Sequence, residues 1–307
     1  MEAKKKIAGV IVLAVTLLLA ACARKEGGQE SFSSPDAAFE ALVTRLEKGE
    51  TTSLTSLLGP GVDELLNSGD AVQDLDDRTH FVASYRTRHS LESPDENTRL
   101  LVHGENDSVF PIPAVKRDGL WVLDGDAGAD ELVYRRVGEN ELGAINVLKG
   151  FVQAQQEYAA VGHDGDPAGI YALKLVSDPG LQNGLYWETA EGEEPSPAGQ
   201  FVANASAEGY RSATGAPYHG YRYRMLYRQG ANANGGARDY FKGGVLTEGF
   251  GLVAWPAEYG SSGVMTFMVN PDGVVFQKDL GDDTQNTVNS ITTFDPDSTW
   301  TAIADTE

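Results

Sequence analysis

Residues 138–161 read GENELGAINVLKGFVQAQQEYAAV and contain the strongest helical pattern in the chain. Apolar residues recur there at helical spacing in two neighbouring stripes, formed by Leu142, Ile145, Leu148 and Val152 and by Ala144, Val147, Phe151, Ala154 and Tyr158. Two adjoining stripes make a wide apolar face, which a sheet should cover. Glu139 and Glu141 complement the positive end of the helix dipole, and Gly162 is a suitable residue for the helix to end on. The stretch therefore predicts a long helix packed on a sheet.

The strands of that sheet are expected further along the chain. Residues 163–217 are rich in glycine, proline and acids and are expected to be irregular. Strand-like runs follow at residues 218–228, 249–256, 264–270 and 274–280. NPDG at 270–273 is a tight turn between the last two runs. A long helix followed by an antiparallel meander makes an α+β unit, and residues 282–307 add a short helix and a tail held by Phe294 and Trp300.

The residues before the long helix predict another small α+β unit. Ser34, Pro35 and Asp36 are the residue types that cap and begin a helix, which is expected to end at Gly49. Further helical pieces are expected at residues 53–58, 63–66 and 78–86, and strands at residues 99–103, 108–115 and 120–124, with the turn KRDG at 116–119. The chain is thus predicted to form two small α+β domains, at residues 34–135 and 136–307, with the boundary near Arg135.

The only cysteine, Cys22, follows a stretch that has the layout of a secretory signal peptide. Three lysines at residues 4–6 precede an uncharged, mostly apolar run, and Leu-Ala-Ala at residues 19–21 leads directly to the cysteine. The sequence LAAC resembles the lipobox of bacterial lipoproteins. That resemblance implies that residues 1–21 are removed and that lipid, with acyl chains such as palmitate, is attached to the Cys22 sulfur. Two alternatives are an uncleaved anchor helix and a secreted protein with an incidental cysteine.

A lipid on Cys22 makes the membrane a partner and places the protein in the bacterial cell envelope, facing the periplasm. Ala23 follows the cysteine, and by the same resemblance this favours the outer over the inner membrane. Residues 22–33 are polar and too poor in apolar side chains to fold alone. They are therefore expected to form a flexible tether between the anchor and the first domain.

Acidic residues dominate the charge of the chain. The full chain has a net charge of −21, and removing residues 1–21, which contain three lysines and one glutamate, changes it to −23. Such a polyanion is a poor partner for nucleic acid, and none is expected. The plain explanation of the excess acid is a solvated surface that keeps the protein soluble.

Several stretches resemble one known family. The longest is GFGLVAWPAEYGSSGVMTFMVNPDGVVFQKDLG at residues 249–281, and shorter ones are GLYW, EGEEPSP, PYHGYRYRML and FDPDSTW. They are similar to exported bacterial lipoproteins of domain-of-unknown-function family 2950, over residues 34–300. This resemblance implies no activity and no catalytic residues.

Two more distant resemblances concern the individual domains. A helix beginning NELGAINVL, a variable loop and strands ending in FMVNPDGVVF resemble the globular head of pseudopilins. The apolar helix through which pseudopilins polymerise has no counterpart in this domain. The first domain, which opens with SPDAAFEALVTRLEKGE and closes with KRDGLWVLDGD, resembles NTF2-like domains.

Asp164 and Asp166 are candidate metal ligands. In HDGDP at residues 163–167 they have the spacing of the first two ligands of an EF-hand loop, and some pseudopilin heads bind calcium. The loop has Ala168 where the next oxygen ligand is needed, and it lacks a late bidentate glutamate. The alternative is an acidic turn at the end of a helix. Calcium is the one cofactor that the sequence suggests.

Five residues are candidates for a ligand or partner surface. Arg222 and Arg224 share one face of an expected strand, and the arginine fork can bind an anion or a carbohydrate. Trp187, Trp255 and Tyr259 lie in loops rich in glycine and proline, where exposed aromatic rings can bind sugars or partners. The structural alternative is that the arginines face water or local acids and the rings close the ends of the sheet.

The sequence contains no convincing catalytic set. GSSG at 260–263 differs from the G-x-S-x-G elbow, there is no H-E-x-x-H, and the five histidines lack metal-ligand spacing. The interpretation is a non-enzymatic envelope protein that binds or scaffolds an unidentified envelope protein or glycan. Two alternatives stay open, an envelope hydrolase that acts on glycan or peptide and a calcium- or small-ligand-binding module.

Overall fold

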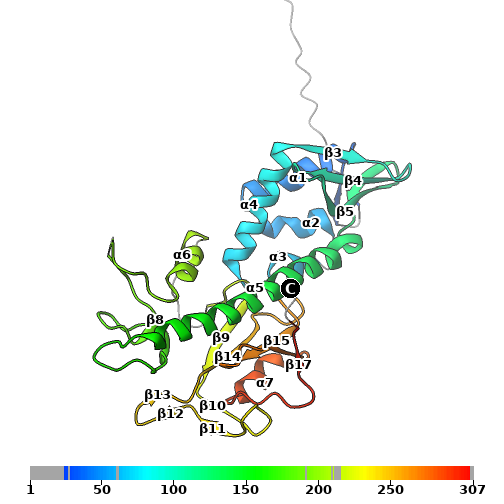
Figure 1. The fold of residues 1–307 in the computed structure, drawn as a ribbon. Coiled ribbons are helices and arrows are strands. Elements are labelled where there is room, and N and C mark those ends of the chain that lie inside the picture. Colours follow the sequence, from blue (N-terminus) through cyan, green and yellow to red (C-terminus); the bar gives the residue numbers. More distant parts are fainter. Residues whose placement is uncertain are drawn as a thin grey trace, which may run out of the picture.

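The computed structural model describes residues 24–26, 28–59, 62–190, 192–208, 210 and 216–304. It confirms the predicted α+β class: helices and antiparallel sheets form two units, which share the long helix α5 (Gly125–Ala160) (Figure 1). Residues 1–21, which are expected to be a signal peptide, and Cys22 lie outside the described residues. Within the described residues, no helix is long and apolar enough to span a membrane.

The N-terminal unit begins with the expected helix α1 (Pro35–Glu47). The Ser34 side chain accepts a hydrogen bond from the Ala37 amide at 3.2 Å, and Pro35 stands in the first turn, as the sequence predicts. The helices that follow are η1 (Thr51–Ser53), α2 (Leu54–Leu58), α3 (Asp63–Leu66) and α4 (Ala71–Thr87). Helix α4 begins earlier than residue 78 because Asp70 caps it, accepting hydrogen bonds from two amides of its first turn.

The sheet of this unit has four antiparallel strands in the order β3-β4-β5-β6. They are β3 (His89–Glu92), β4 (Thr98–His103), β5 (Ser108–Arg117) and β6 (Leu120–Leu123). The sequence analysis missed β3, whose residues other than Leu91 are polar and exposed. The core lies between this sheet and the helices, and its fully buried members include Phe39, Leu54, Leu101 and Ile112.

Residues that were expected to form a flexible tether are partly ordered. Strands β1 (Arg24–Glu26) and β2 (Gln29–Ser31) pair as a hairpin, and Phe32 pairs with Trp121 of β6. The Gln29 amide donates to the Leu57 carbonyl at 3.1 Å and to the Leu123 carbonyl at 2.6 Å. The low apolar content of these residues predicted a flexible tether, but the hairpin is held by main-chain pairing and by the Gln29 side chain, which apolar content does not measure.

Helix α5 begins at Gly125, well before residue 138, so the expected boundary near Arg135 lies inside a continuous helix. Its first turns pack on β5, and a Cβ atom added at Gly128 would lie 2.5 Å from the Pro111 carbonyl carbon. Glycine at position 128 lets the helix approach the strand closely.

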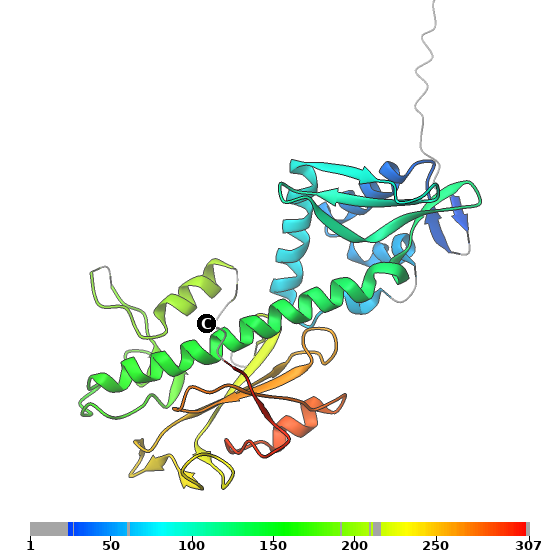
Figure 2. The same ribbon diagram turned by 45° about the vertical axis from the view of Figure 1, so that its right-hand side comes forward.

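The second half of α5 covers one face of a five-stranded antiparallel sheet, and α7 (Thr284–Ser290) covers the other face (Figure 2). The strand order is β17-β16-β15-β14-β9, from β9 (Tyr221–Leu226), β14 (Gly251–Pro256), β15 (Met265–Val269), β16 (Phe276–Asp279) and β17 (Thr301–Ala302). Of the two predicted apolar stripes, the one with Ala144 and Phe151 is largely buried. In the other stripe, Leu142 is 65% exposed.

Short elements occupy the loops around this sheet. The stretch expected to be irregular contains a parallel strand pair and a helix: β7 (Lys174–Val176), β8 (Gly184–Tyr186) and α6 (Gly199–Ala207). Two small antiparallel pairs follow β9: β10 (Arg228–Gln229) with β11 (Arg238–Asp239), and β12 (Phe241–Lys242) with β13 (Val245–Leu246).

Candidate functional site

Two of the predicted surface residues, Arg224 and Trp255, hold α7 against the sheet. The Arg224 guanidinium donates to the carbonyls of Val288 at 2.5 Å and Ile291 at 2.8 Å, at the end of α7, and lies 5.4 Å from the Trp255 ring centroid. The Trp255 indole donates to the Gln285 side chain at 3.2 Å, and Trp255 is only 7% exposed. Arg224 thus faces helix α7 instead of water or local acids, and Trp255 lies within strand β14 instead of in a loop.

The other three predicted surface residues lie in two separate pockets. Arg222 and Tyr259 line a polar pocket of about 490 Å³ beside α7, in which the Tyr259 hydroxyl donates to Asp279 at 3.0 Å. Trp187 lines another pocket, of about 480 Å³, where the His163 ring lies 5.3 Å from it. The structure thus brings Arg222 and Tyr259 together and leaves Trp187 with a different set of neighbours.

Asp164 occupies a turn at the end of α5. It has a positive φ of 51°, and its carboxylate accepts a hydrogen bond from the Gln182 amide at 2.7 Å. Among the described residues, no group of three or more histidine, cysteine, aspartate and glutamate side chains is placed to hold a metal ion. Calcium at Asp164 and Asp166 stays a prediction.

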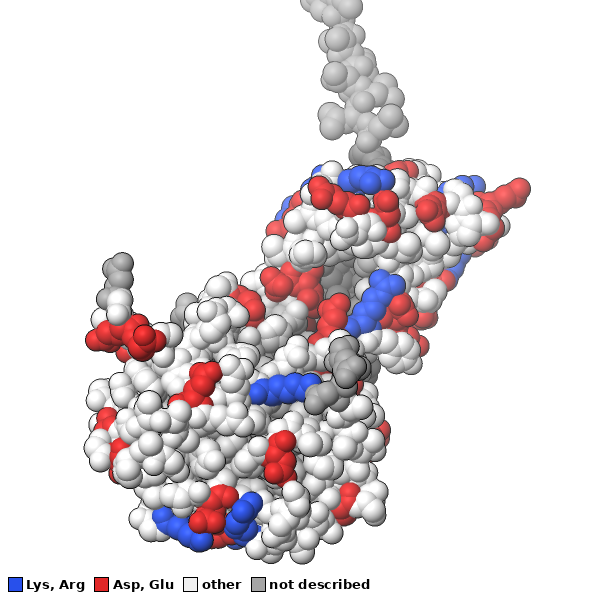
Figure 3. Space-filling model, viewed as in Figure 1, with Lys and Arg blue, Asp and Glu red and all other residues white. Residues whose placement is uncertain are grey.

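A larger cleft, of about 560 Å³, lies in the N-terminal unit between the helices and β5. Its apolar lining comes from several elements and includes Leu42, Leu46, Leu54, Phe81, Phe110 and Ile112. Charged and imidazole side chains from α4, β4 and α5 also line it, namely Asp76, Asp77, Arg78, His80, His103, Arg135, Arg136 and Glu139. Charged side chains of both signs surround the hollow between the two units in Figure 3. An apolar pocket with a few convergent polar groups is the usual form of a binding site.

Two of the three cleft arginines already have partners within the protein. Arg135 pairs with Glu131 at 2.8 Å and donates to the Val109 carbonyl at 3.2 Å. Arg136 is bound at the junction described below. His103 shares a hydrogen bond of 2.8 Å with the Ser84 hydroxyl, and its pKa is lowered, first by burial and then by the nearby His80 and Arg135. These groups leave little positive charge for a ligand.

The cleft acids are less well neutralised. Asp77 accepts one hydrogen bond, from the Gln73 amide at 2.8 Å, and Asp76 and Glu139 make no hydrogen bond or ion pair with any described residue. Partial desolvation raises the pKa of Asp77, although its side chain remains open to solvent. The Gln73 hydrogen bond and the charge of Arg136 oppose this rise, and the neighbouring acids Asp74 and Asp76 add to it. The lining thus holds three acids and three arginines, but two of the arginines are paired with acids outside the lining, whereas the three acids form no ion pair with a described residue.

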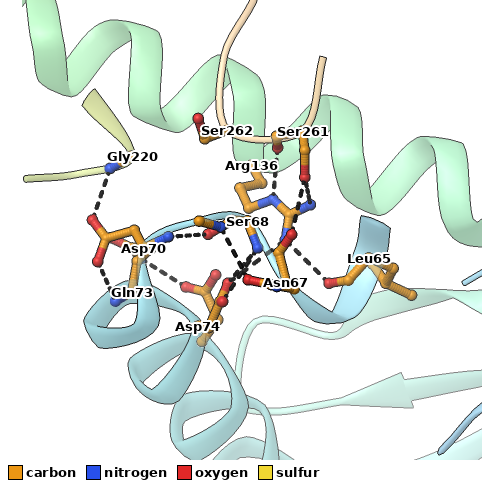
Figure 4. Close-up of polar contacts among 12 residues, drawn as sticks. Leu65, Asn67, Ser68, Asp70, Gln73, Asp74, Arg136, Gly220, Ser261 and Ser262 are labelled. Atoms are coloured by element: carbon orange, nitrogen blue, oxygen red, sulfur yellow. Dashed lines mark hydrogen bonds and ion pairs between the residues drawn. The ribbon is translucent and has the colours of Figure 1, made fainter. Parts of the chain in front are cut away.

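A buried polar network fixes α5 beside this cleft (Figure 4). The Arg136 guanidinium donates to the Ser261 carbonyl at 3.0 Å, the Ser261 hydroxyl at 3.1 Å and the Leu65 carbonyl at 3.1 Å, and lies 3.8 Å from Asp74. Arg136 and Asp74 are 9% and 8% exposed. Ser261 belongs to the GSSG stretch between β14 and β15, so this serine connects the two units.

Asp70 completes the junction from the N-terminal end of α4. One carboxylate oxygen caps the helix, and the other accepts hydrogen bonds from the Gly220 amide and the Tyr210 hydroxyl, each at 3.0 Å. Asn140 of α5 donates to the Ser262 carbonyl at 2.9 Å. The two units are thus joined by a shared helix and by side chains that are buried between them.

Together these features define an α+β protein of two units with an acid-rimmed cleft in the first unit. The family described as "Protein of unknown function (DUF2950)" matches residues 29–303, and the chain belongs to this family. Comparison with the curated proteins and with the solved structures found no match. The resemblances of the separate domains to pseudopilin heads and NTF2-like domains stay predictions.

The sequence analysis did not identify the cleft residues. Asp76 and Asp77 stand in the acidic run DLDDR at residues 74–78, and Glu139 was assigned only a role at the helix dipole. The run could have indicated a binding surface, because it places these acids next to the apolar Leu75, which is exposed on α4. Its connection with Glu139 depends on how α4 packs against α5, which one sequence does not specify.

Proposed function

We propose that the protein is a lipid-anchored envelope protein that binds a cationic, amphipathic peptide segment of another envelope component in the cleft of its N-terminal unit. The observation that carries this proposal is the set of acids around an apolar lining: Asp76, Asp77 and Glu139 form no ion pair with any described residue. The apolar lining would take leucine- or phenylalanine-like side chains of the partner, and the acids would take its lysines or arginines.

The charge of the whole chain supports the same choice of ligand. The net charge, −21 for the full chain and −23 without residues 1–21, creates a field that attracts cations and repels anions, and it raises the rate at which a basic segment arrives. Arg78 is the one cleft arginine without a hydrogen bond or ion pair to a described residue. An anionic or nucleic-acid ligand would therefore find one available cation and several acids.

The cellular location in this proposal depends on Cys22. Lipid on its sulfur would hold the protein at the envelope, facing the periplasm, and Ala23 favours the outer membrane over the inner. Fractionation of cells that make the native chain and the Cys22→Ser variant tests the anchor. We expect the native chain in the membrane fraction with a mass that includes lipid and lacks residues 1–21. An unmodified thiol in the membrane-bound protein would refute the anchor and leave the cleft untouched.

Calorimetric titration tests the ligand class. The probes are a short peptide of alternating lysine and leucine and its counterpart of alternating glutamate and leucine, which has the same apolar content. We expect saturable binding of the lysine peptide and none of the glutamate peptide. Binding of both peptides with similar affinity would show that charge does not select the ligand, and the proposal would fail.

Two double variants separate the cleft from the general attraction of a polyanion. Asp77→Asn with Glu139→Gln removes two cleft acids, whereas Glu105→Gln with Asp130→Asn removes two exposed acids outside the cleft lining. Both change the net charge equally. We expect the first pair to weaken binding of the lysine peptide at least about tenfold and the second less than about twofold. Equal losses would assign the binding to the surface as a whole.

One observation favours the second hypothesis, a hydrolase. Asp77 has a raised pKa and shares the cleft with Glu139, and a carboxyl group with a raised pKa is suited to act as a general acid. Incubating the protein with the lysine peptide and with glycan strands of the envelope, and measuring new amino or reducing ends, distinguishes the two. Product that disappears in Asp77→Asn would replace binding with hydrolysis as the function.

A further inference from the structure

Another cavity, of about 250 Å³, lies in the C-terminal unit between α5 and α6. Its walls come from α5, α6, β8, β9 and β14, and include Val147, Phe151, Leu185, Phe201, Ala205 and Leu252. None of the described residues that line it is charged, although 22% of the chain is. It therefore differs in chemistry from the acid-rimmed cleft of the N-terminal unit.

Helix α6 covers this cavity without being part of a closed core. No residue of α6 is fully buried, and its Phe201 is 39% exposed. The Phe201 ring rests on α5 at Gly150, where an added Cβ atom would lie 2.0 Å from the ring. The helix is thus positioned by this aromatic contact and by a hydrogen bond from the Ala198 amide at its start to the Leu185 carbonyl at 2.9 Å, and space beside these contacts stays unfilled by protein.

The apolar lining continues to the protein surface. Leu175 and Val176 of β7 line the cavity and are 38% and 46% exposed, so an apolar molecule that fills the cavity could continue across the rim. Tyr218 also lines the cavity, and its hydroxyl has no hydrogen-bond partner among the described residues. Exposed apolar side chains grouped at the mouth of a cavity are typical of a ligand site.

We propose that this cavity binds the hydrocarbon chain of an uncharged or zwitterionic single-chain or membrane lipid. An apolar cavity of about 150 Å³ is enough to bind benzene, so this larger one holds a longer apolar group. Among the described residues, the lining offers no cation for a carboxylate or phosphate and no acid for an amine, so a charged group of the ligand is expected to stay outside. The inference is independent of the peptide site.

Binding of the neutral fluorescent probe N-phenyl-1-naphthylamine tests it. The Cys22→Ser variant of the full chain is the starting protein, because it cannot carry an acyl chain of its own that would fill the cavity. We expect the probe to bind saturably with increased emission and to be displaced by decanol. Phosphatidylcholine that stays on the protein after incubation with vesicles and their removal by centrifugation would assign the chain to a membrane lipid, and its absence to a free single-chain lipid. Failure of decanol to displace the probe would refute the proposal.

Two tryptophan substitutions on α6 provide the matched control. Ala205→Trp places a large ring in the cavity, whereas Ala203→Trp places the same ring on the exposed side of the same helix, outside the lining. We expect Ala205→Trp to weaken probe binding at least about tenfold and Ala203→Trp less than about twofold. Circular dichroism establishes that both variants fold. Equal affinity of the two folded variants would place the probe elsewhere and overturn the assignment.

Discussion

Replacing Arg136 by methionine tests whether the buried network at the junction holds the two units together. Methionine keeps much of the apolar bulk of the arginine stem but removes three hydrogen bonds of 3.0 to 3.1 Å and the ion pair with Asp74. Removing one partner of a buried charged pair costs about 3–5 kcal/mol, because the remaining charge stays desolvated. We therefore expect the free energy of unfolding to fall by about 3–5 kcal/mol.

Urea unfolding followed by circular dichroism measures this loss, and Arg135→Met is its control. Arg135 is the next residue along α5, but its ion pair with Glu131 is about half exposed, and such pairs contribute about 0.2–1 kcal/mol. Adding Asp74→Asn to Arg136→Met should restore part of the stability, since the amide oxygen can still accept from Ser68 and no unpaired charge remains. If Arg136→Met costs no more than Arg135→Met, the junction is not the rigid connection described above.

Three further predictions follow from other parts of the fold. Hydrogen bonds from Arg86 lower the pKa values of Glu40 and Glu47. The two carboxylates therefore stabilise the fold above the usual pKa of 4.5, and this stabilisation is lost as the pH falls through the lowered pKa values. Urea unfolding between pH 5 and 3 should show a smaller loss of unfolding free energy in Arg86→Met than in the native chain. Because the pKa of Asp77 is raised, the affinity for the lysine peptide should fall on acidification at a higher pH than an ordinary aspartate would give, and calorimetry should find this component missing in Asp77→Asn. Gly128→Ala should lower the thermal midpoint, since its Cβ would collide with the backbone of β5. The same change at Gly138, where nothing lies within 4 Å, should raise the midpoint, because alanine stabilises a helix by about 0.5–1 kcal/mol relative to glycine.

Periodicity predicted the elements whose patterns are local. The apolar spacing of residues 138–161 and the runs separated by NPDG specify a helix and two strands regardless of their surroundings, and these elements are present. The first turns of α5 were missed because Gly125 and Gly128 have low helix propensity, and their use is visible only when β5 packs against them. Strand β3 was missed for a similar reason, since its polar residues become a strand by pairing with β4.

Arg224 and Trp255 show where residue-type reasoning about sites fails. An arginine and an aromatic ring on neighbouring strands suit both ligand recognition and the capping of a helix end, and the sequence does not contain the position of α7 that decides between them. For the cleft the error is the reverse: its acids Asp76 and Asp77 stand in an acidic run of the sequence, but the sequence analysis assigned them no role. In both cases the deciding information is the packing of a helix that lies far away in the sequence.

The ordered hairpin β1–β2 limits how far the N-terminal unit could lie from a lipid on Cys22. Arg24, the first residue of β1, is two positions after Cys22, and two extended residues span at most about 7 Å. If Cys22 carries lipid, as we propose, no long tether separates the anchor from the hairpin, and the N-terminal unit lies close to the membrane surface. The Arg136 network and the continuous helix α5 then fix the C-terminal unit relative to that surface. The acid-rimmed cleft would belong to the membrane-proximal unit, and a partner that reaches it would need a basic segment able to approach the bilayer closely.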